Sequence, residues 1–299
     1  MDKRKCGNTR QVRAAYELAF TSGREAGKNC VLVQNGALEV LFNKSNALDI
    51  TWVKYKGVKI SFLSKDGLNP GICEFVGNFE GGFLYTCGMD NISNCVEGKP
   101  MHGSMHYMPA ENVAISYEGD AIVVSGIVRE AALFGKSLTM HRRFTVTERS
   151  ITISDTVENE GFAPADYVLL YHVNYGYPFL DECLKLELDV EKTDARTEIA
   201  KKRFDERFSI TYPLDVNDED CYYHTMKTGN VKLENPELDI AVTMLYDASE
   251  FPITLQWKSM TSGDYALGIE PTLTRFDDFK MRTLLPSEKK DHKIEIQFC

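Results

Sequence analysis

The chain has 299 residues, of which 43% are hydrophobic and 26% charged, a balance that is typical of a globular protein with a packed core. Its formal net charge of −10 disfavours nucleic acid and anionic membranes as partners, because little positive charge is available for phosphate groups. The sequence has no apolar run of about 18 residues that could span a bilayer. A neutral small molecule is the expected partner.

The N-terminal segment predicts a short helix over residues 9–20, where Val12, Ala15, Leu18 and Ala19 follow helical spacing. After this segment the pattern changes to short apolar runs and alternating residues, which are typical of strands. Strands are expected at 31–33, 38–42, 58–62, 114–117, 121–128, 137–146, 150–157, 166–172, 231–233, 240–246, 253–257, 265–270 and 292–298.

Many strands at short spacing, separated by Gly, Asn and Asp turns, predict an all-β sandwich with few short helices. No linker or low-complexity tract divides the chain, so residues 1–299 are expected to form a single domain. Two long polar and aromatic stretches, 67–111 and 191–229, are predicted to be irregular, and the first is expected to line a site.

The location is predicted from the N-terminus and the cysteines. No apolar segment of the kind found in secretory signals follows Met1, so a secretory signal is not expected. The eight cysteines are scattered without a Cys-x-x-Cys pair, which favours free thiols in a reducing cytoplasm.

His102 and His106 are spaced like two metal ligands on a helix, but Gly103 and Pro109 oppose a helix there. The acid of the His-Glu-x-x-His motif is also missing, so no metal site is expected. Beside Asn91, His102 is better explained as a hydrogen-bond donor to a polar ligand, and a histidine that stabilises the loop is the alternative.

His172 ends an apolar run and Glu270 ends an apolar strand, and each has an ordinary explanation when taken alone. A histidine in such a run is often a satisfied core residue, and a carboxylate at a strand end is often a solvated turn residue. The apolar residues before Glu270 would raise its pKa by desolvation, as a general base near neutrality requires. Brought together, the two side chains would supply the acid and the base that open and close a sugar ring.

The order of several segments resembles the galactose mutarotase-like superfamily, and within it an aldose 1-epimerase-like branch once classed as a domain of unknown function. The resemblance is carried by residues 81–91, 101–103 with 109–110, 153–161 with 171–178, and 256–258 with 268–271. It implies a large antiparallel β-supersandwich with a sugar-binding cleft and no metal or cofactor.

The resemblance also implies roles for single residues. His172 matches the histidine that protonates the ring oxygen, Glu270 the base that removes the anomeric proton, and His102 a histidine that binds a sugar hydroxyl. The further residues expected to line the cleft are Asn91, Asn174, Trp257, His224 and Arg275, although Trp257 could instead be a core residue.

The chain departs from this family where the well-studied mutarotases carry an Asn-Arg-Ile motif. Here the corresponding residues are Met89, Asp90 and Asn91, without an arginine. Even so, the resemblance and the pair His172 and Glu270 predict a cytoplasmic aldose 1-epimerase-like enzyme that acts on a monosaccharide. A homodimer is a compatible assembly. A carbohydrate-binding or sensing protein without turnover is the first alternative, and a different isomerisation, such as C2 epimerisation, is the second.

Overall fold

The protein is built almost entirely from antiparallel strands in the computed structural model, which describes residues 4–68, 75–95 and 98–299. A five-stranded sheet runs in chain order through β1 (Arg13–Ala19), β2 (Asn29–Asn35), β3 (Leu38–Asn43), β4 (Asp49–Tyr55) and β5 (Val58–Lys59). The helices are all short: η1 (Thr9–Gln11), η2 (Phe75–Gly77), η3 (Met105–Tyr107), α1 (Glu198–Lys202) and η4 (Phe204–Glu206). None of the helices in the described residues is long and apolar enough to cross a bilayer.

The second sheet has 13 strands and crosses the whole molecule. Its main order is β17 (Arg282–Leu284), β11 (Ala165–Gly176), β16 (Asp264–Thr272), β15 (Ile253–Thr261), β13 (Asp220–Asn235), β14 (Ile240–Tyr246), β18 (Lys289–Phe298), β10 (Ser150–Asn159), β9 (Ser137–Val146), β8 (Ala121–Ala131) and β7 (Glu111–Glu118). Two strands lie off this path, β6 (Leu84–Met89) beside β11 and β12 (Lys185–Ala195) beside β13.

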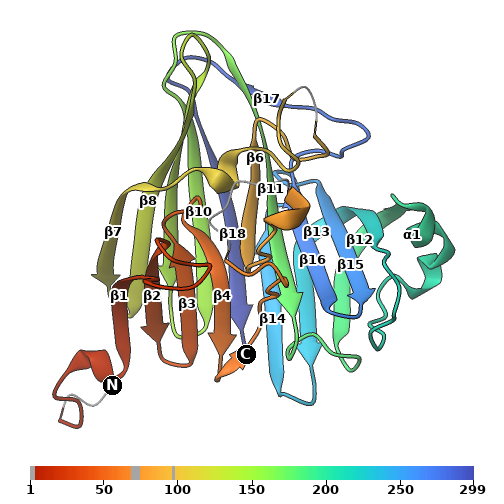
Figure 1. Ribbon diagram of the computed structural model, residues 1–299, viewed down its shortest axis with the longest axis horizontal. Coiled ribbons are helices and arrows are strands. Elements are labelled where there is room, and N and C mark those ends of the chain that lie inside the picture. The colour runs from red at the N-terminus through yellow and green to blue at the C-terminus, as the bar shows by residue number, and fades with distance from the viewer. Residues whose placement is uncertain (1–3, 69–74, 96–97) are drawn as a thin grey trace.

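The small sheet packs on the face of the large sheet formed by β8, β9, β10 and β18 (Figure 1). Along β10, buried and half-buried residues alternate strictly, as expected of a strand with one face in the core. The aromatic rings of Phe42 and Phe144 meet across the two sheets with centroids 4.9 Å apart, and Tyr55 meets Phe298 at 5.6 Å. The predicted all-β supersandwich with few short helices is confirmed.

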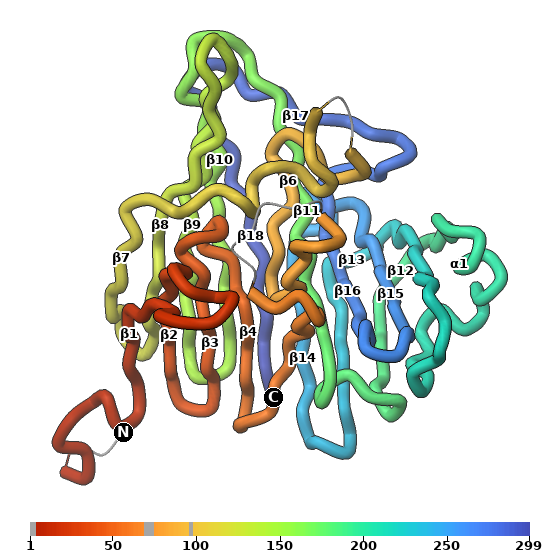
Figure 2. Tube along the Cα trace, viewed as in Figure 1, coloured from red at the N-terminus to blue at the C-terminus, as the bar shows by residue number. Residues whose placement is uncertain are grey.

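Strand β11 is buried along nearly its whole length, in contrast to the alternating strands. It pairs with β6 on one side and with β16 on the other, and the three strands lie side by side (Figure 2). A strand covered on both faces is apolar throughout. A polar side chain on β11, such as that of His172, is therefore held in a dry environment.

The helix predicted over residues 9–20 is wrong. After the single turn of η1, the chain forms the strand β1, in which only Ala14 is buried, and this strand pairs with β2 at the edge of the small sheet. Sheet pairing with a neighbour outweighs local helix preference in a segment with so few core residues. The stretches predicted to be irregular also contain regular structure, namely β6 in the first, and α1 with parts of β12 and β13 in the second.

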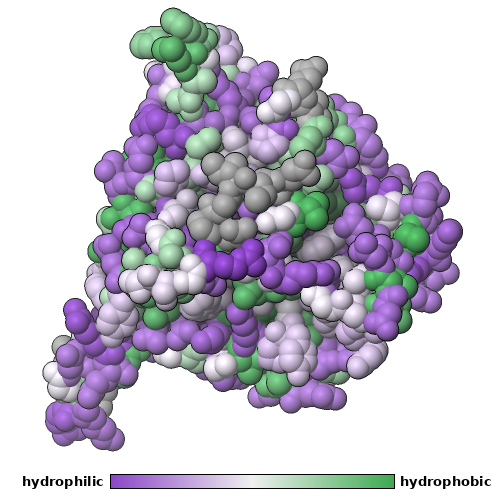
Figure 3. Space-filling model, in the orientation of Figure 1, coloured by the Kyte–Doolittle hydropathy of each residue, from purple (hydrophilic) through white to green (hydrophobic). Residues whose placement is uncertain are grey.

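The turns after β8 and after β10 project together from the body of the molecule (Figure 1), and hydrophobic side chains gather at their tip (Figure 3). Leu133, Phe134 and Phe162 are 87%, 101% and 102% exposed. Single exposed apolar residues are normal, but three at one tip form a small patch. None of these residues lines the cavity described next, so the tip is a separate surface.

Candidate functional site

A cavity of about 160 Å³ opens beside β11, β15 and β16. Its described lining consists of Phe75, Phe79, Asn94, Met101, His102, His172, Arg196, Glu219, Cys221, Leu255, Trp257, Glu270 and Phe276. Aromatic and aliphatic side chains make up most of this wall, with a few polar groups that converge on it. This composition is typical of a site for a small organic ligand.

His172 and Glu270 meet at the bottom of the cavity, with Nε2 of the imidazole 3.2 Å from Oε1 of the carboxyl group. The antiparallel pairing of β11 with β16 explains this contact. Val173 lies opposite Ile269, so the neighbouring residues His172 and Glu270 also lie opposite each other. His172 is 5% exposed and Glu270 is fully buried. The predicted acid and base are thus brought together.

Glu270 has an unusual environment for a carboxyl group. Apart from the imidazole of His172, neither of its oxygens has a hydrogen-bond partner among the residues that the structure describes. Buried polar atoms in native structures are nearly always satisfied, so a carboxyl group that faces a cavity without such a partner is a position where a polar ligand group can form a hydrogen bond.

Burial shifts the two groups in opposite directions. It raises the pKa of Glu270 well above 4.5, and the negative charge of Glu219 raises this pKa further. Burial also lowers the pKa of His172 well below 6.5, and the nearby imidazole of His102 lowers this pKa further. Burial therefore favours the uncharged form of each group, which is the protonated carboxyl of Glu270 and the neutral imidazole of His172.

This arrangement predicts that Glu270→Gln stabilises the protein at neutral pH. Below pH 4.5 both the folded and the unfolded chain hold the carboxyl proton; above it the unfolded chain releases the proton and the folded chain retains it, so stability falls as pH rises. Glutamine has no proton to release and so removes this pH-dependent cost. We expect the free energy of unfolding to rise by about 0.5–2 kcal/mol, as is common for single stabilising substitutions. Urea unfolding across pH measures the gain, which should vanish below pH 4.5. A gain that does not change with pH would contradict the assignment.

Gly268 provides the space in which the pair meets. A Cβ atom at this position would lie 2.5 Å from Oε1 of Glu270, 3.1 Å from Cε1 of His172 and 3.3 Å from Cβ of Trp257. Any side chain here would therefore push the two functional groups apart.

We expect Gly268→Ala to lower catalysis of the reaction proposed below by about 100-fold, the cost of displacing reacting groups by about 1 Å. Gly7→Ala is the matched control, because a Cβ atom there meets no atom within 4 Å. Anomer-exchange rates and melting temperatures of both variants check the prediction. Equal rates in the two variants would show that the contact with the pair is unimportant.

His102 reaches the cavity from a tight loop between β6 and β7. Its backbone is left-handed, with φ of 63°, and Gly103 follows at 81°. A Cβ atom on Gly103 would lie 2.3 Å from the Asn91 carbonyl oxygen, so only glycine fits after this histidine. The His-Gly sequence is thus required by the shape of the loop.

The polarity expected for His102 was wrong. Its Nδ1 lies 2.9 Å from the carbonyl oxygen of Ile92, which can only accept, so Nδ1 carries the hydrogen. Burial lowers the pKa of His102 to about 4, and the ring is neutral near pH 7. Its free Nε2 therefore offers an acceptor to a ligand hydroxyl, where the sequence suggested a donor.

Trp257 lies in the cavity wall as expected, with its ring centroid 5.6 Å from that of His172 and 5.9 Å from that of Phe79. Its indole N–H donates a hydrogen bond to Glu219 Oε2 at 2.8 Å. The aromatic face is therefore fixed in one orientation beside His172 and Glu270, while Glu219 is held at the rim.

Four other residues expected at the cleft do not belong to the described lining of the cavity. Asn91 donates to the carbonyl oxygens of Asn94 and Pro100, both at 2.9 Å, and so shapes the loop that carries His102. Asn174 lies buried on β11, and its side-chain amide donates a hydrogen bond to the backbone carbonyl oxygen of His172 at 3.3 Å.

His224 and Arg275 are engaged elsewhere. The imidazole of His224 is fully buried between Thr193, at 2.9 Å, and Gln256, at 2.8 Å. The guanidinium of Arg275 lies 2.7 Å from Asp194. Both residues stabilise the wall behind the cavity and do not face it.

Arg196 and Glu219 line the cavity and were missed by the reasoning from sequence. Arg196 follows the end of β12 and Glu219 immediately precedes β13. Both lie in the stretch 191–229, whose length and polarity suggested a functional segment. That location was the available signal, because neither residue stands in a recognisable motif.

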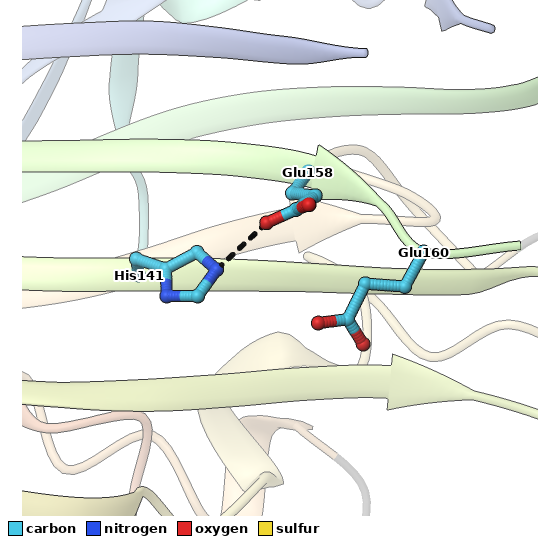
Figure 4. A group of neighbouring side chains, drawn as sticks. All are labelled: His141, Glu158 and Glu160. Carbon is cyan, nitrogen blue, oxygen red and sulfur yellow. Dashed lines mark hydrogen bonds and ion pairs between the residues drawn. The ribbon is translucent and has the colours of Figure 1, made fainter. Parts of the chain in front are cut away.

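One group outside the cavity has the composition of a metal site. His141, Glu158 and Glu160 place their ligand atoms within 4.8 Å of one another (Figure 4). However, Lys289 lies 2.9 Å from Glu158, and Arg129 forms an ion pair with Glu160. Since both carboxylates already have a cationic partner, the group is best described as a cluster of surface ion pairs.

The same sheet arrangement occurs in solved bacterial structures. A protein from Klebsiella pneumoniae subsp. pneumoniae MGH 78578, provisionally named an aldose 1-epimerase, has a TM-score of 0.85 at 17% identity, over 96% of this chain and 88% of that chain. A galactose mutarotase-like protein from Clostridium acetobutylicum has a TM-score of 0.74 at 14% identity, over 96% of this chain and 99% of that one. A protein from Escherichia coli K12, also provisionally named an aldose 1-epimerase, has a TM-score of 0.65 at 11% identity, over 91% of this chain and 99% of that one.

These likenesses define the class of protein by its fold, which is that of the galactose mutarotase-like proteins. Within this class the chain belongs to the family described as Domain of unknown function (DUF4432), which matches residues 25–297. No curated protein matches the sequence.

Proposed function

We propose that this protein is an aldose 1-epimerase that interconverts the anomers of a monosaccharide. The observation that carries the proposal is the contact of His172 with Glu270, 3.2 Å apart, at the bottom of a small cavity. A cavity of about 160 Å³ suits a single sugar ring better than an oligosaccharide. The tryptophan and phenylalanine rings beside the pair suit the apolar face of such a ring.

The reaction needs one proton donor and one proton acceptor. One group takes the proton from the anomeric hydroxyl while the other donates a proton to the ring oxygen, and the C1–O5 bond breaks to give the open aldehyde. Rotation about C1–C2 followed by the reverse proton transfers yields the other anomer. In the assignment we propose, His172 protonates O5 and Glu270 accepts the proton of O1.

The single proton of the resting pair fits this cycle. Burial favours the neutral state, with the proton on Glu270. The proton crosses the 3.2 Å contact to His172 as the sugar hydroxyls begin to solvate the pair, before the ring comes between the two groups. The pair returns to its starting state after each turnover, because the reaction moves protons without net gain or loss. His102 Nε2 and Glu219 are placed to accept from other sugar hydroxyls.

Exchange spectroscopy by NMR tests this proposal. We expect the protein to increase the rate at which α and β anomers interconvert for at least one sugar in a panel of aldoses and sugar acids. In heavy water, carbon-bound hydrogen at C2 should stay in place, since mutarotation breaks no C–H bond. Uncatalysed rates across the whole panel would reject the proposal, and deuterium at C2 would indicate a different isomerisation.

A binding protein without turnover is the second candidate. It is favoured by the absence of an arginine at Met89, Asp90 and Asn91, where Asp90 instead accepts a hydrogen bond from the Ser104 backbone at 3.0 Å. Calorimetric binding of a sugar without any anomer exchange would support this candidate. The free cysteines, of which Cys30, Cys87 and Cys221 are buried, suit a reducing compartment, and we place the activity in the cytoplasm.

A further inference from the structure

Arg196 is the cationic side chain of the described cavity lining, and it has no anionic partner there. Its backbone N–H donates to the Cys221 carbonyl oxygen at 2.8 Å, which anchors it beside β13. Its guanidinium lies over the ring of Phe276, 5.0 Å from the centroid. These two contacts hold the half-buried side chain against the cavity wall.

Two other arginines, Arg203 and Arg275, differ from Arg196 in that each forms an ion pair. Arg203 lies 3.0 Å from Asp218, and Arg275 lies 2.7 Å from Asp194. In the part of the chain that the structure describes, no carboxylate lies within 4.0 Å of the Arg196 guanidinium. Glu219 acts on it at longer range, but this carboxylate is already bound by the indole N–H of Trp257.

A guanidinium has five donors in a planar fork that matches the two oxygens of a carboxylate. When such a fork faces a cavity without an ion-pair partner, a ligand carboxylate is the natural group to satisfy it. A phosphate dianion fits less well, since the described lining contains a single cation and Glu219 adds a negative charge. The cavity thus offers a ligand one guanidinium without an ion-pair partner, which is enough to bind a single carboxylate group.

We infer that Arg196 selects sugar acids, so that the substrate of the site is a monosaccharide bearing one carboxylate, such as a hexuronate. This inference rests on the proposed function, because it assigns the substrate class of the same cavity. It places the anion of the substrate on Arg196 and the anomeric centre between His172 and Glu270. Uronates then differ from neutral hexoses by one charge-assisted, bidentate contact.

The test compares matched sugars that differ only at C6. Anomer exchange is measured for glucose, glucuronate and glucose 6-phosphate, and for the corresponding galactose series. With wild type we expect kcat/KM to be roughly 10- to 100-fold higher for the uronates than for the neutral hexoses, as one hydrogen-bonded charged contact would give. Arg196→Gln should abolish this preference by lowering kcat/KM for the uronates more than for the neutral hexoses, with Arg196→Lys in between. Arg143→Gln removes the same charge from an exposed pair with Glu118 and should change nothing.

Two outcomes overturn the inference. Arg196→Gln could lower the rates of uronates and hexoses by the same factor, which would make Arg196 a hydroxyl ligand. The 6-phosphates could instead be preferred and lose this preference in the variant. If no sugar is exchanged at all, the proposed function fails, and calorimetric titration of glucuronate into wild type and Arg196→Gln still decides the inference, since only wild type should bind it.

Discussion

Replacement of Glu270 by glutamine is expected to lower kcat for anomer exchange by about 10²- to 10⁴-fold, which is the usual contribution of a positioned acid or base. The amide fills the same space and can still donate a hydrogen bond to Nε2 of His172, 3.2 Å away in wild type. It cannot take up or release a proton. The loss would therefore report proton transfer and leave sugar binding largely unchanged.

The partner residue supplies the internal check. His172→Gln should reduce kcat by a similar factor, and the double variant should be little worse than either single variant, because two groups that exchange one proton act as a unit. Glu118→Gln, which alters an exposed carboxylate on β7, is the matched control. Strictly additive losses, or losses confined to KM, would indicate that the pair only binds the sugar.

The pH dependence follows from the shifted pKa values. Since the pKa of Glu270 is raised and that of His172 is lowered, the singly protonated pair persists over a wide range around neutrality. The acid limb of kcat should lie below pH 6.5, where His172 takes up a second proton. The alkaline limb should arise from Glu270 and should disappear from the residual activity of Glu270→Gln.

His172 and Glu270 could be predicted from sequence because each stands in a short segment with a distinctive pattern of neighbours. Their contact could not be derived from those segments, since it depends on the register in which β11 pairs with β16. The need for Gly268 follows from the same register, because this position faces Glu270 and the imidazole together. Register is determined by packing across the whole sheet, which local sequence does not contain.

The remaining residues of the predicted site show the same limit. His224 has the side chain of a ligand-binding residue, but Thr193 and Gln256 take both of its ring nitrogens. Arg275 was expected in the cleft, but the arginine that lines the cavity is Arg196. The guanidinium of Arg196 lies over the ring of Phe276, the residue that follows Arg275 in the chain. Residue type indicates what a side chain can do, whereas the partners that leave it free or occupied come from distant segments.

The second large effect that we expect is on stability, and it concerns a buried ion network beside β11. Arg142 is 1% exposed, and its guanidinium lies 2.7 Å from Asp49 and 3.0 Å from Asp155. Thr86 and Tyr171 donate hydrogen bonds to these carboxylates at 2.6 and 2.8 Å. The network thereby joins the small sheet, through β4, to β6, β9, β10 and β11 of the large sheet.

Arg142→Met is expected to lower the free energy of unfolding by about 3–5 kcal/mol, because it leaves two buried carboxylates without their cation. Urea unfolding measures this loss. Arg143→Met is a close control, since Arg143 is the next residue on β9 but points to the surface and pairs with Glu118. An exposed pair of this kind contributes about 0–1 kcal/mol. Similar losses in both variants would contradict the role assigned to the network.

Replacing the three charged residues together distinguishes two costs: that of burying an unpaired charge and that of losing the ion pairs. In the triple variant Arg142→Met, Asp49→Leu, Asp155→Leu the guanidinium and both of its carboxylates are removed together, so part of the lost stability should return. The return is incomplete because His106 loses its contact with Asp49, which is 2.8 Å long in wild type. The hydroxyl of Tyr171 would still lose its acceptor, and Tyr171 immediately precedes His172 on β11. We therefore expect the triple variant to regain stability while its kcat remains below that of wild type. Such a result would support a role of the ion network in keeping β11, and with it the imidazole of His172, in the position that the proposed proton transfer requires.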